Sequence, residues 1–431
     1  MLMEAAQSND RTVQRAQHFL DSLLAGYRGT PYAVRFWDGS TWNPTDHEPR
    51  FTLILQHPGA LRRMFLPANE LTLGEAYIYD DFDVEGDIET GISFADYFSE
   101  LRPGLFEKLR PAPYLLSLPA RERPGSFRQA ARLAGKTHSR ERDWQAVTYH
   151  YNISNDFYHL WLDERMVYSC AYFATPDESL EAAQKRKLDY LCRKLRLQPG
   201  ERLLDIGCGW GGLILHAARC YGVEALGITL SEPQAELANE RIRAAGLEGR
   251  CRAEMHDYRE VDEAEGFDKL VSVGMFEHVG LTRLQEYFAK AWRLLRPGGV
   301  FLNHGIGASL ARPLPEGPSF IDRYVFPDGE LLPIATTLHA AESSGFEIRD
   351  LENLREHYML TLRHWVRRLE ARREEAVRLT DEVTYRVWRL YMAACAYSFR
   401  TGRLNLYQTL LSRPAGDNSR LPLTRADWYI N

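Results

Sequence analysis

The stretch "LLDIGCGWGGL", Leu203–Leu213, decides the fold of this 431-residue chain. It joins a short apolar strand, "RLLDIG", to a helix that begins within "GGLILHAARCYG". The glycines between them, Gly207, Gly209, Gly211 and Gly212, let the backbone approach a ligand, and the start of the helix offers free N–H groups. Dinucleotide, methyl-donor and nucleotide sites share such a loop, and a tight structural turn has the same pattern.

Strands and helices alternate on both sides of this loop. A helix is expected over 180–195, and further helices within 231–246 and 284–299. Strands are expected within 223–230, 249–258, 267–280 and 300–307. Because helices separate the strands, we predict an α/β fold with a doubly wound parallel sheet, whose ligand lies beyond the carboxyl ends of the strands.

Composition narrows the functional classes. A net charge of −6 argues against a general nucleic-acid binder. The six cysteines form no CxxC pair and no zinc spacing, so we expect no metal site. Since the sequence shows no secretory signal, a reduced cytoplasmic setting is the simplest expectation. No apolar run approaches the roughly 18 residues of a spanning helix, so any membrane contact is expected to be peripheral.

Three details of the loop and its neighbours favour S-adenosylmethionine as the ligand. Asp205, in Asp-Ile-Gly-Cys-Gly, is placed to orient the methionine end. The segment "LRPGGVFLNH" resembles the turn and strand that follow the fourth helix in class I methyltransferases. Asp257, in "MHDY", ends a predicted strand where an acid accepts from the adenine amino group. An acid for the ribose hydroxyls is missing after the second strand, which leaves Thr229 and Gln234 as polar partners.

Seven motifs in a fixed order carry a family resemblance. They are "YHYNISNDFY", "MVYSCAYF", "LDIGCGWGG", "GITLSEPQ", "MFEHVG", "NHGIG" and "IDRYVFPDGELLP". Together they resemble the cyclopropane-fatty-acyl-phospholipid synthases and their mycolic-acid-modifying relatives. The resemblance covers roughly 147–413, and "LGEAYIYDDFDVEGD" is similar to an N-terminal signature of the bacterial phospholipid enzymes.

The resemblance implies a cofactor site and a bicarbonate site. The residues implied for S-adenosylmethionine are Tyr168 and Ser169 at the methionine part, Gly207 and Gly209 along it, Thr229, Leu230 and Gln234 at the ribose side, and Asp257 at the adenine. The positions that match the family's bicarbonate site are Cys170, Glu277, His304, Ile306 (through its backbone) and Tyr358. Two positions depart from the family pattern, since Gly305 replaces a bulkier residue and Tyr407 stands where tryptophan is expected.

The implied reaction transfers a methylene group from S-adenosylmethionine to the cis double bond of an unsaturated phospholipid acyl chain. Water must be excluded from the carbocation, and aromatic faces favour positive charge. The aromatics expected to wall the site are Tyr151, Phe157, Tyr158, Trp161, Tyr172 and Phe173. Bound bicarbonate would be the base, with Glu277 sharing its proton and His304 orienting it, while His278 is structural and Cys170 is a pocket-wall thiol.

Three other activities stay open from the sequence. The same cation chemistry could end in a methyl-branched or methylene-bearing acyl chain. Ordinary methyl transfer to a small molecule would make the bicarbonate residues dispensable. A lipid-binding protein that had lost its chemistry would be recognised by the loss of Glu277 or His304, yet both are present.

The resemblance and the composition together predict three parts. Residues 1–120 are expected to form a smaller mixed N-terminal domain for lipid docking or dimerisation, followed by a basic linker over 121–145. Residues 146–431 are expected to form a class I, Rossmann-like catalytic domain with a helical lid and a helical C-terminal extension. Arg121–Asp143 holds seven basic and three acidic residues, which fits either a solvated surface or anionic headgroups. We therefore expect a cytoplasmic enzyme at the inner face of the membrane, and a homodimer as one alternative role for the N-terminal part.

Overall fold

The chain divides into two compact units. The computed structural model describes residues 10–45, 47–100, 112–120, 131, 133–151, 153–262, 264–314, 317 and 319–429. The smaller unit comprises Met1–Ala130, Pro315–Val325 and Thr380–Tyr397, and the larger unit comprises Ala131–Leu314, Phe326–Leu379 and Ser398–Asn431. Two segments that the sequence boundaries assign to the catalytic part thus belong to the smaller unit. Residues 121–130 and 132 of the predicted linker lie outside the described residues.

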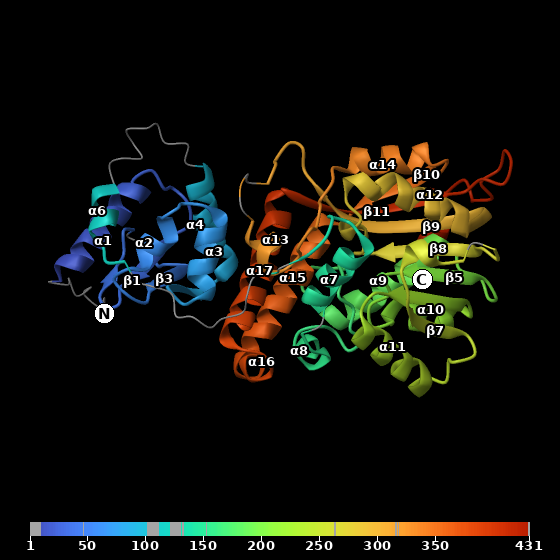
Figure 1. The fold of residues 1–431 in the computed structure, drawn as a ribbon, viewed down its shortest axis with the longest axis horizontal. Helices are drawn as coiled ribbons and strands as arrows, with labels where there is room; N and C mark the ends of the chain where they lie inside the picture. Colours follow the sequence, from blue (N-terminus) through green and yellow to red (C-terminus); the bar gives the residue numbers. More distant parts are fainter. Residues whose placement is uncertain are drawn as a thin grey trace. The chain divides into compact units, whose positions relative to one another are not determined.

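The larger unit is built on a seven-stranded sheet in the order β10-β11-β9-β8-β5-β6-β7 (Figure 1). Its strands are β5 (Arg202–Ile206), β6 (Glu224–Thr229), β7 (Cys251–Met255), β8 (Phe267–Val273), β9 (Leu295–Ala308), β10 (Glu347–Asn353) and β11 (Leu404–Ser412). The five strands from β5 to β9 pair in parallel, which confirms the predicted α/β fold. The C-terminal extension adds β11, which is antiparallel to both β9 and β10.

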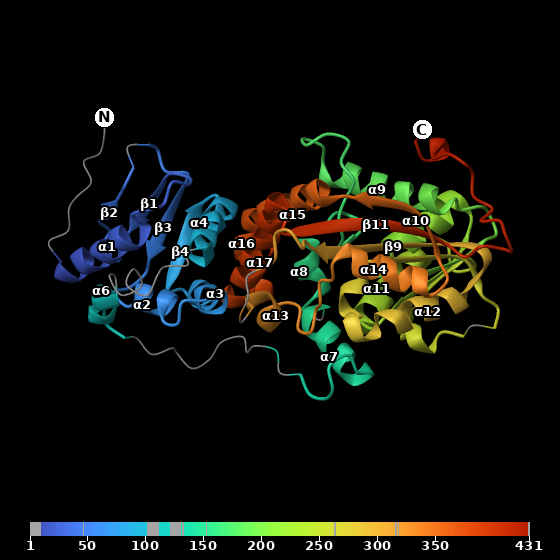
Figure 2. The same ribbon diagram turned by 90° about the horizontal axis from the view of Figure 1, so that it is seen from above.

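Helices cover both faces of this sheet. Figure 2 shows α9 (Leu180–Leu195) and α10 (Gly212–Tyr221) on one side of the strands, and α12 (Leu284–Leu294) and α14 (Ile334–Ser343) on the other. Neighbouring residues of β5 pack in different apolar cores, one on each face of the sheet, because successive side chains of a strand point to opposite faces. Leu203 packs in one apolar cluster and Leu204 in the other, and both are fully buried.

The remaining helices of the larger unit lie in its N-terminal part, between β6 and β7, and in its C-terminal extension. They are α7 (Arg140–Tyr151), α8 (Asn155–His159), α11 (Glu232–Ala244), α15 (Arg355–Ala371) and α16 (Arg373–Leu379), with the short 3-10 turns η1 (Tyr258–Glu260), η2 (Phe276–His278), η3 (Leu281–Arg283) and η4 (Ala426–Trp428). Ser154 caps α8 by accepting from the Phe157 N–H. The extension is therefore rich in helices, as predicted, but two strands enclose them.

The smaller unit has its own four-stranded sheet in the order β2-β1-β3-β4. Its elements are α1 (Arg11–Leu24), β1 (Tyr32–Arg35), β2 (Thr41–Trp42), β3 (Phe51–Leu55), α2 (Ala60–Phe65), α3 (Glu70–Ile78), β4 (Phe82–Gly86), α4 (Ile88–Glu100), α6 (Ala112–Ser117), α13 (Phe320–Tyr324) and most of α17 (Glu382–Thr401). Arg386 of α17 is buried and donates to Asp80 and Asp83, each at 2.8 Å. Such a buried cation needs its acidic partners, so the late helix belongs to this unit.

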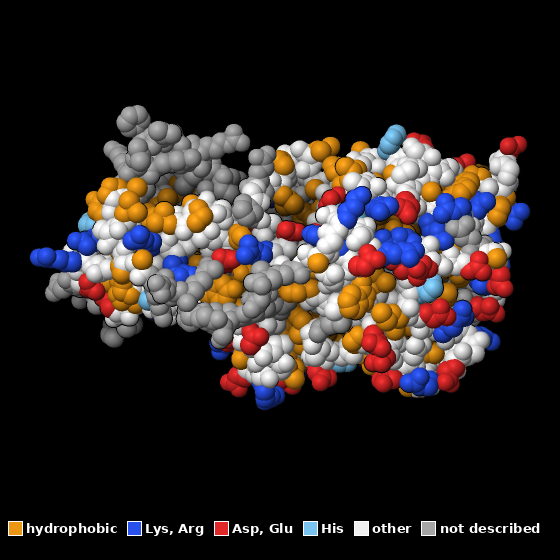
Figure 3. All heavy atoms as spheres, in the orientation of Figure 1, with side chains coloured by type: hydrophobic (Ala, Val, Ile, Leu, Met, Phe, Trp, Pro, Cys, Tyr) orange, Lys and Arg blue, Asp and Glu red, His pale blue; other side chains and the backbone are white. Residues whose placement is uncertain are grey.

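Neither a membrane span nor a metal cluster is found in the part of the chain that the structure describes. No helix there is long and apolar enough to cross a bilayer. No group of three or more histidine, cysteine or acidic side chains is placed to hold a metal ion among the same residues. Over the larger unit, Figure 3 shows acidic and basic side chains interspersed rather than gathered by sign.

Candidate active site

A cavity opens beyond the carboxyl ends of β5, β6, β7 and β8 in the larger unit. It encloses about 1210 Å³, its open mouth included. All nine residues predicted to bind the cofactor line it, namely Tyr168, Ser169, Asp205, Gly207, Gly209, Thr229, Leu230, Gln234 and Asp257. The position agrees with the rule that open α/β sheets bind ligands at the carboxyl edge of their strands.

The glycine loop brings bare backbone to the cavity wall. Gly207 has a φ of +88°, and a Cβ there would lie 2.7 Å from the Cβ of Met275. Gly209 also has a positive φ, of +53°, but a Cβ there would meet no atom within 4 Å. Gly207 is thus required by both conformation and space, whereas Gly209 faces the open cavity. Helix α10 begins at Gly212, so its first N–H groups point toward the same loop.

Two buried ionisable groups flank the methionine end of the predicted site. Burial raises the pKa of Asp205 to about 7, although the charge of Lys187 opposes this shift. The Nζ of Lys187 donates to the Ser169 Oγ at 2.8 Å, and the Gln184 Nε2 donates to the Ser169 carbonyl at 2.8 Å. Lys187 belongs to none of the motifs that predicted the site. Its spacing of four residues from both Ala183 and Leu191, which are buried, was the available signal.

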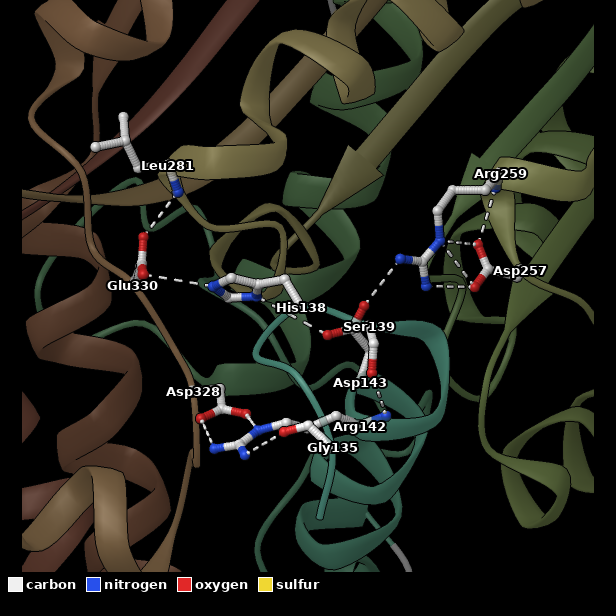
Figure 4. A network of polar contacts seen from close by, with 10 residues as sticks. All are labelled: Gly135, His138, Ser139, Arg142, Asp143, Asp257, Arg259, Leu281, Asp328 and Glu330. Atoms are coloured by element: carbon white, nitrogen blue, oxygen red, sulfur yellow. Dashed lines mark hydrogen bonds and ion pairs between the residues drawn. The ribbon is translucent and has the colours of Figure 1, made fainter. Parts of the chain in front are cut away.

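The adenine side is held by a polar network that reaches α7 (Figure 4). Asp257 accepts from Arg259 at 2.6 and 2.9 Å, and Arg259 also lies 3.0 Å from Asp143 of α7. Burial opposes ionisation of Asp257, but the hydrogen bonds and charge of Arg259 outweigh it and hold its pKa below the ordinary value. Asp257 is therefore an ionised acceptor at neutral pH. On the ribose side, Thr229 donates to Gln234 at 2.8 Å.

The segment before α7 is fixed to a later loop of the same unit, as Figure 4 also shows. His138 lies 3.4 Å from Glu330, whose carboxylate accepts from the Leu281 N–H at 2.7 Å. Arg142 donates to both oxygens of Asp328, at 2.5 and 2.8 Å. These contacts hold α7, which supplies Asp143 and Tyr151, against the cavity mouth.

Two of the five predicted bicarbonate residues, Glu277 and Ile306, are in contact beside this cavity, although none of the five is among the residues that line it. The Glu277 Oε1 accepts from the Ile306 N–H at 2.7 Å. His304 lies two residues earlier on β9, on the same face of the strand as Ile306. The Glu277 Oε2 and the His304 Nε2 are buried and have no hydrogen-bond partner among the described residues. Two buried polar atoms without partners fit a small polar ligand that can both donate and accept hydrogen bonds.

The protonation of this pair follows from its burial. Burial raises the pKa of Glu277 to about 7, against the lowering effect of the Ile306 N–H. Burial and the charges of Lys187 and Lys194 hold the pKa of His304 well below its ordinary value. His304 is therefore neutral, and Glu277 carries a proton for a large part of the time at neutral pH.

Cys170 and Tyr358 are linked through the backbone carbonyl of Leu354. The Cys170 Sγ contacts the Ala171 carbonyl at 3.2 Å and the Leu354 carbonyl at 4.0 Å. That same Leu354 carbonyl accepts from the Tyr358 N–H. The Leu354 N–H in turn donates to the carbonyl of Leu406 on β11, and Leu406 pairs with Ile306 of β9. Burial raises the pKa of Cys170 well above its ordinary value, so its thiol stays neutral. A neutral buried thiol is a poor nucleophile, and Cys170 is not among the residues that line the cavity.

The aromatic stretch that precedes the glycine loop forms two layers. Tyr151 lines the cavity, as does His278, whose pKa burial lowers to about 4. Behind Tyr168, Trp161 packs with its ring centroid 5.3 Å away, and Phe157 and Tyr158 are fully buried. The other two predicted wall residues stack on α15 instead, with Tyr172 against His357 at 4.7 Å and Phe173 against His364 at 5.5 Å. His278, predicted to be structural, thus lies in the cavity wall.

A sheet of this order, with a glycine-loop cavity at the carboxyl ends of its parallel strands, defines a class I S-adenosylmethionine-dependent methyltransferase. The particular family is shown by sequence comparison. The family model described as mycolic acid cyclopropane synthetase matches residues 138–409, so the chain belongs to the cyclopropane synthase family. A second model, described as a domain of unknown function, matches residues 19–97 of the smaller unit.

Relatives extend the likeness over both units. A probable fatty acid methyltransferase of Pseudomonas putida is 42% identical over 403 residues, which cover 93% of this chain and 96% of that protein. The cyclopropane-fatty-acyl-phospholipid synthase of Escherichia coli is 38% identical over 302 residues, covering 69% and 76% respectively. The solved mycolic acid cyclopropane synthase CmaA1, complexed with SAH and CTAB, is 35% identical, covers 62% of this chain and 97% of its own, and superposes with a TM-score of 0.59.

Proposed function

We propose that this enzyme transfers a methylene group from S-adenosylmethionine to the cis double bond of an unsaturated phospholipid acyl chain and so forms a cyclopropane. Membership of the cyclopropane synthase family supports the methyl donor and the class of reaction. The observation that carries the proposal is the Glu277–Ile306–His304 group, with its two buried, unpartnered polar atoms among the described residues. Ordinary methyl transfer to a small molecule would not need this group.

The chain's own residues provide what the carbocation requires. When bound, S-adenosylmethionine supplies the electrophilic methyl group, and bicarbonate supplies the base for the final proton. Glu277, His304 and the Ile306 N–H would hold the bicarbonate. Because Glu277 and His304 are 8% and 1% exposed, bulk water does not reach them readily. A protonated Glu277 and a neutral His304 are poorer nucleophiles toward an alkyl cation than a free carboxylate would be.

The protonation states of Glu277 and His304 suit a bound anion. A protonated Glu277 donates through its O–H, which avoids the repulsion of two anions in contact. The neutral His304 donates through only one ring nitrogen, so the nitrogen that carries its proton decides whether it can hold an anion. With Glu277 protonated and His304 neutral, the pair would orient the base without adding a charge of its own.

A second product is favoured by a specific observation. The Pseudomonas putida protein, which matches along 93% of this chain, is named a probable fatty acid methyltransferase. The same cation gives a methyl-branched, still unsaturated chain when a proton leaves a neighbouring chain carbon, and a methylene-bearing chain when a hydride shift precedes loss of a methyl proton. Both products require the same donor and the same group around Glu277, so only analysis of the product separates them.

A phospholipid substrate requires access to a bilayer. The smaller unit and the basic segment 121–142 are our candidates for docking at the inner face of the membrane, and much of that segment lies outside the described residues. Flotation with anionic vesicles tests this proposal, because attraction between basic residues and headgroups weakens as salt rises. Binding that does not respond to salt would reject the electrostatic part, and a dimer by light scattering would favour a dimerisation role.

The decisive experiment combines the enzyme, isotope-labelled S-adenosylmethionine and vesicles of a monounsaturated phospholipid. Mass and fragmentation of the recovered acyl chain distinguish a ring, a methyl branch, a methylene group and an unmodified chain. Glu277→Gln and His304→Ala should each bind S-adenosylhomocysteine as the wild type does and lose at least about 100-fold in turnover. Glu236→Gln, at an exposed position of α11, is the matched control and should keep full activity. Full activity in both site variants would contradict the proposed role of the group.

A further inference from the structure

Lys187 is a buried cation in the wall of the cofactor cavity. It lies on α9, is 2% exposed and lines the cavity together with Ser169 and Asp205. Its Nζ donates to the Ser169 Oγ at 2.8 Å. Within the described residues no carboxylate lies within ion-pair distance of it. The lysine therefore uses one of its three donors and forms no contact ion pair there, although the charges of Asp163 and Asp205 act on it from farther away.

This arrangement is unfavourable unless a ligand completes it. Removing an ammonium group from water costs several kcal/mol when no anion compensates, and an apolar side chain of similar volume would fill the position at lower cost. Burial lowers the pKa of Lys187 to about 8, which still leaves the amine mostly protonated at neutral pH. The chain thus maintains a buried positive charge that no carboxylate of the described residues contacts directly.

Asp205, in the same cavity, lacks a hydrogen-bond donor for one of its carboxyl oxygens. Its Oδ1 is buried and has no hydrogen-bond partner among the described residues. An amine with spare donors and a carboxyl oxygen without a donor together match a zwitterion, which carries a carboxylate and an ammonium on one carbon. The amino-acid end of S-adenosylmethionine is such a zwitterion.

Helix α9 holds the intervening backbone in position for this contact. Gln184, three residues before Lys187 on the same helix face, donates to the carbonyls of Val167 at 3.3 Å and Ser169 at 2.8 Å. The backbone between those carbonyls includes Tyr168, the other residue expected at the methionine part. One face of α9 therefore holds the 167–169 backbone through the Gln184 amide and places the Lys187 amine beside it.

We propose that Lys187 binds the carboxylate of the amino-acid end of S-adenosylmethionine, together with the Ser169 hydroxyl, while Asp205 receives the ammonium group. Ser169 and Asp205 are predicted at this end from the sequence, whereas no cation is predicted there. The inference depends on the methyl donor that the family uses. It does not depend on the acyl product or on bicarbonate.

The test compares two ligands that differ only in the carboxylate. Isothermal titration calorimetry measures the affinity of S-adenosylhomocysteine and of its decarboxylated analogue for the wild type and for Lys187→Met. The variant should bind S-adenosylhomocysteine about 10- to 100-fold more weakly, the range for losing a charged hydrogen bond. It should bind the decarboxylated analogue within about 3-fold of the wild type, because that ligand has no carboxylate for Lys187 to hold.

A matched control and a stability measurement separate this role from a structural one. Lys290, another buried lysine, donates to the Val261 carbonyl at 2.7 Å, so Lys290→Met should leave both affinities unchanged. Lys187→Met should unfold in urea no earlier than the wild type, and Lys187→Gln is the second variant if it does. An equal loss for both ligands, or an unchanged affinity for S-adenosylhomocysteine in the Lys187 variants, would overturn the proposal.

Discussion

Replacing Glu277 by glutamine should change how the stability of the protein depends on pH. The carboxyl has an ordinary pKa of 4.5 and is raised to about 7 in the folded chain, chiefly by burial. A raised acid binds its proton more tightly in the folded state, so its contribution to the free energy of unfolding is complete below pH 4.5. That contribution is then lost as the pH rises through about 7, because the folded state must bury the ionised form.

The size of the effect follows from the two pKa values. At ~1.4 kcal/mol per pH unit, the interval from 4.5 to about 7 corresponds to about 3 kcal/mol in total. Between about pH 5.5 and about pH 8, roughly 2 kcal/mol of this should be lost by the wild type. An uncharged glutamine keeps the shape of the protonated acid and has no proton to lose, so Glu277→Gln should lack this slope.

Urea unfolding, followed by far-UV circular dichroism at both pH values, measures the difference. Stability of the variant relative to the wild type should increase by about 2 kcal/mol from about pH 5.5 to about pH 8. Asp205, whose pKa is also raised to about 7, is present in both proteins and cancels in this comparison. Parallel pH profiles for the two proteins would refute the reasoning, because Glu277 would then titrate as it does in the unfolded chain.

Two further predictions concern the glycine loop and the partner of His304. Gly207→Ala should cost more than about 2 kcal/mol in urea unfolding, because its Cβ would lie 2.7 Å from Met275, whereas Gly209→Ala should cost only about 1 kcal/mol for its positive φ. Similar losses in both variants would contradict the role of the Met275 contact. Gln408→Leu removes the amide nitrogen 3.2 Å from the His304 Nδ1, so turnover should fall about 10-fold or more while calorimetry shows unchanged binding of S-adenosylhomocysteine. Unchanged turnover would show that this contact does not orient the ring.

The cofactor half of the site was predictable because its residues are close in sequence to the elements that place them. Asp205, Thr229 and Asp257 each stand at or just after the end of a parallel strand, and such ends meet at one edge of a sheet. A pattern of strands and glycines therefore located the cavity wall. Lys187 escaped notice because its segment is rich in charge, and only its spacing from buried neighbours indicated that it points inward.

The rest required contacts between distant segments that no local pattern encodes. β11 pairs with β9 across about a hundred residues, and this pairing places Gln408 opposite His304. Arg386 joins the smaller unit by pairing with Asp80 and Asp83, some 300 residues earlier in the chain. Each of these side chains looks ordinary within its own helix or strand, so its partner becomes visible only in the folded chain.

Substitutions in the two halves of the site should therefore have different effects on the fold. The donor half is formed by consecutive strand–loop–helix segments, and altering one of them disturbs the core as well as the ligand, as the Met275 contact of Gly207 shows. The proposed reacting half comprises η2 and β9, where the Glu277 side chain accepts from the Ile306 N–H, and the start of α15, which β11 links to β9 through Leu406. Small shifts of these pieces would move the proton acceptor relative to the acyl chain without disturbing the donor. This independence accounts physically for a family in which relatives named as cyclopropane synthases and as fatty acid methyltransferases share one methyl-donor fold.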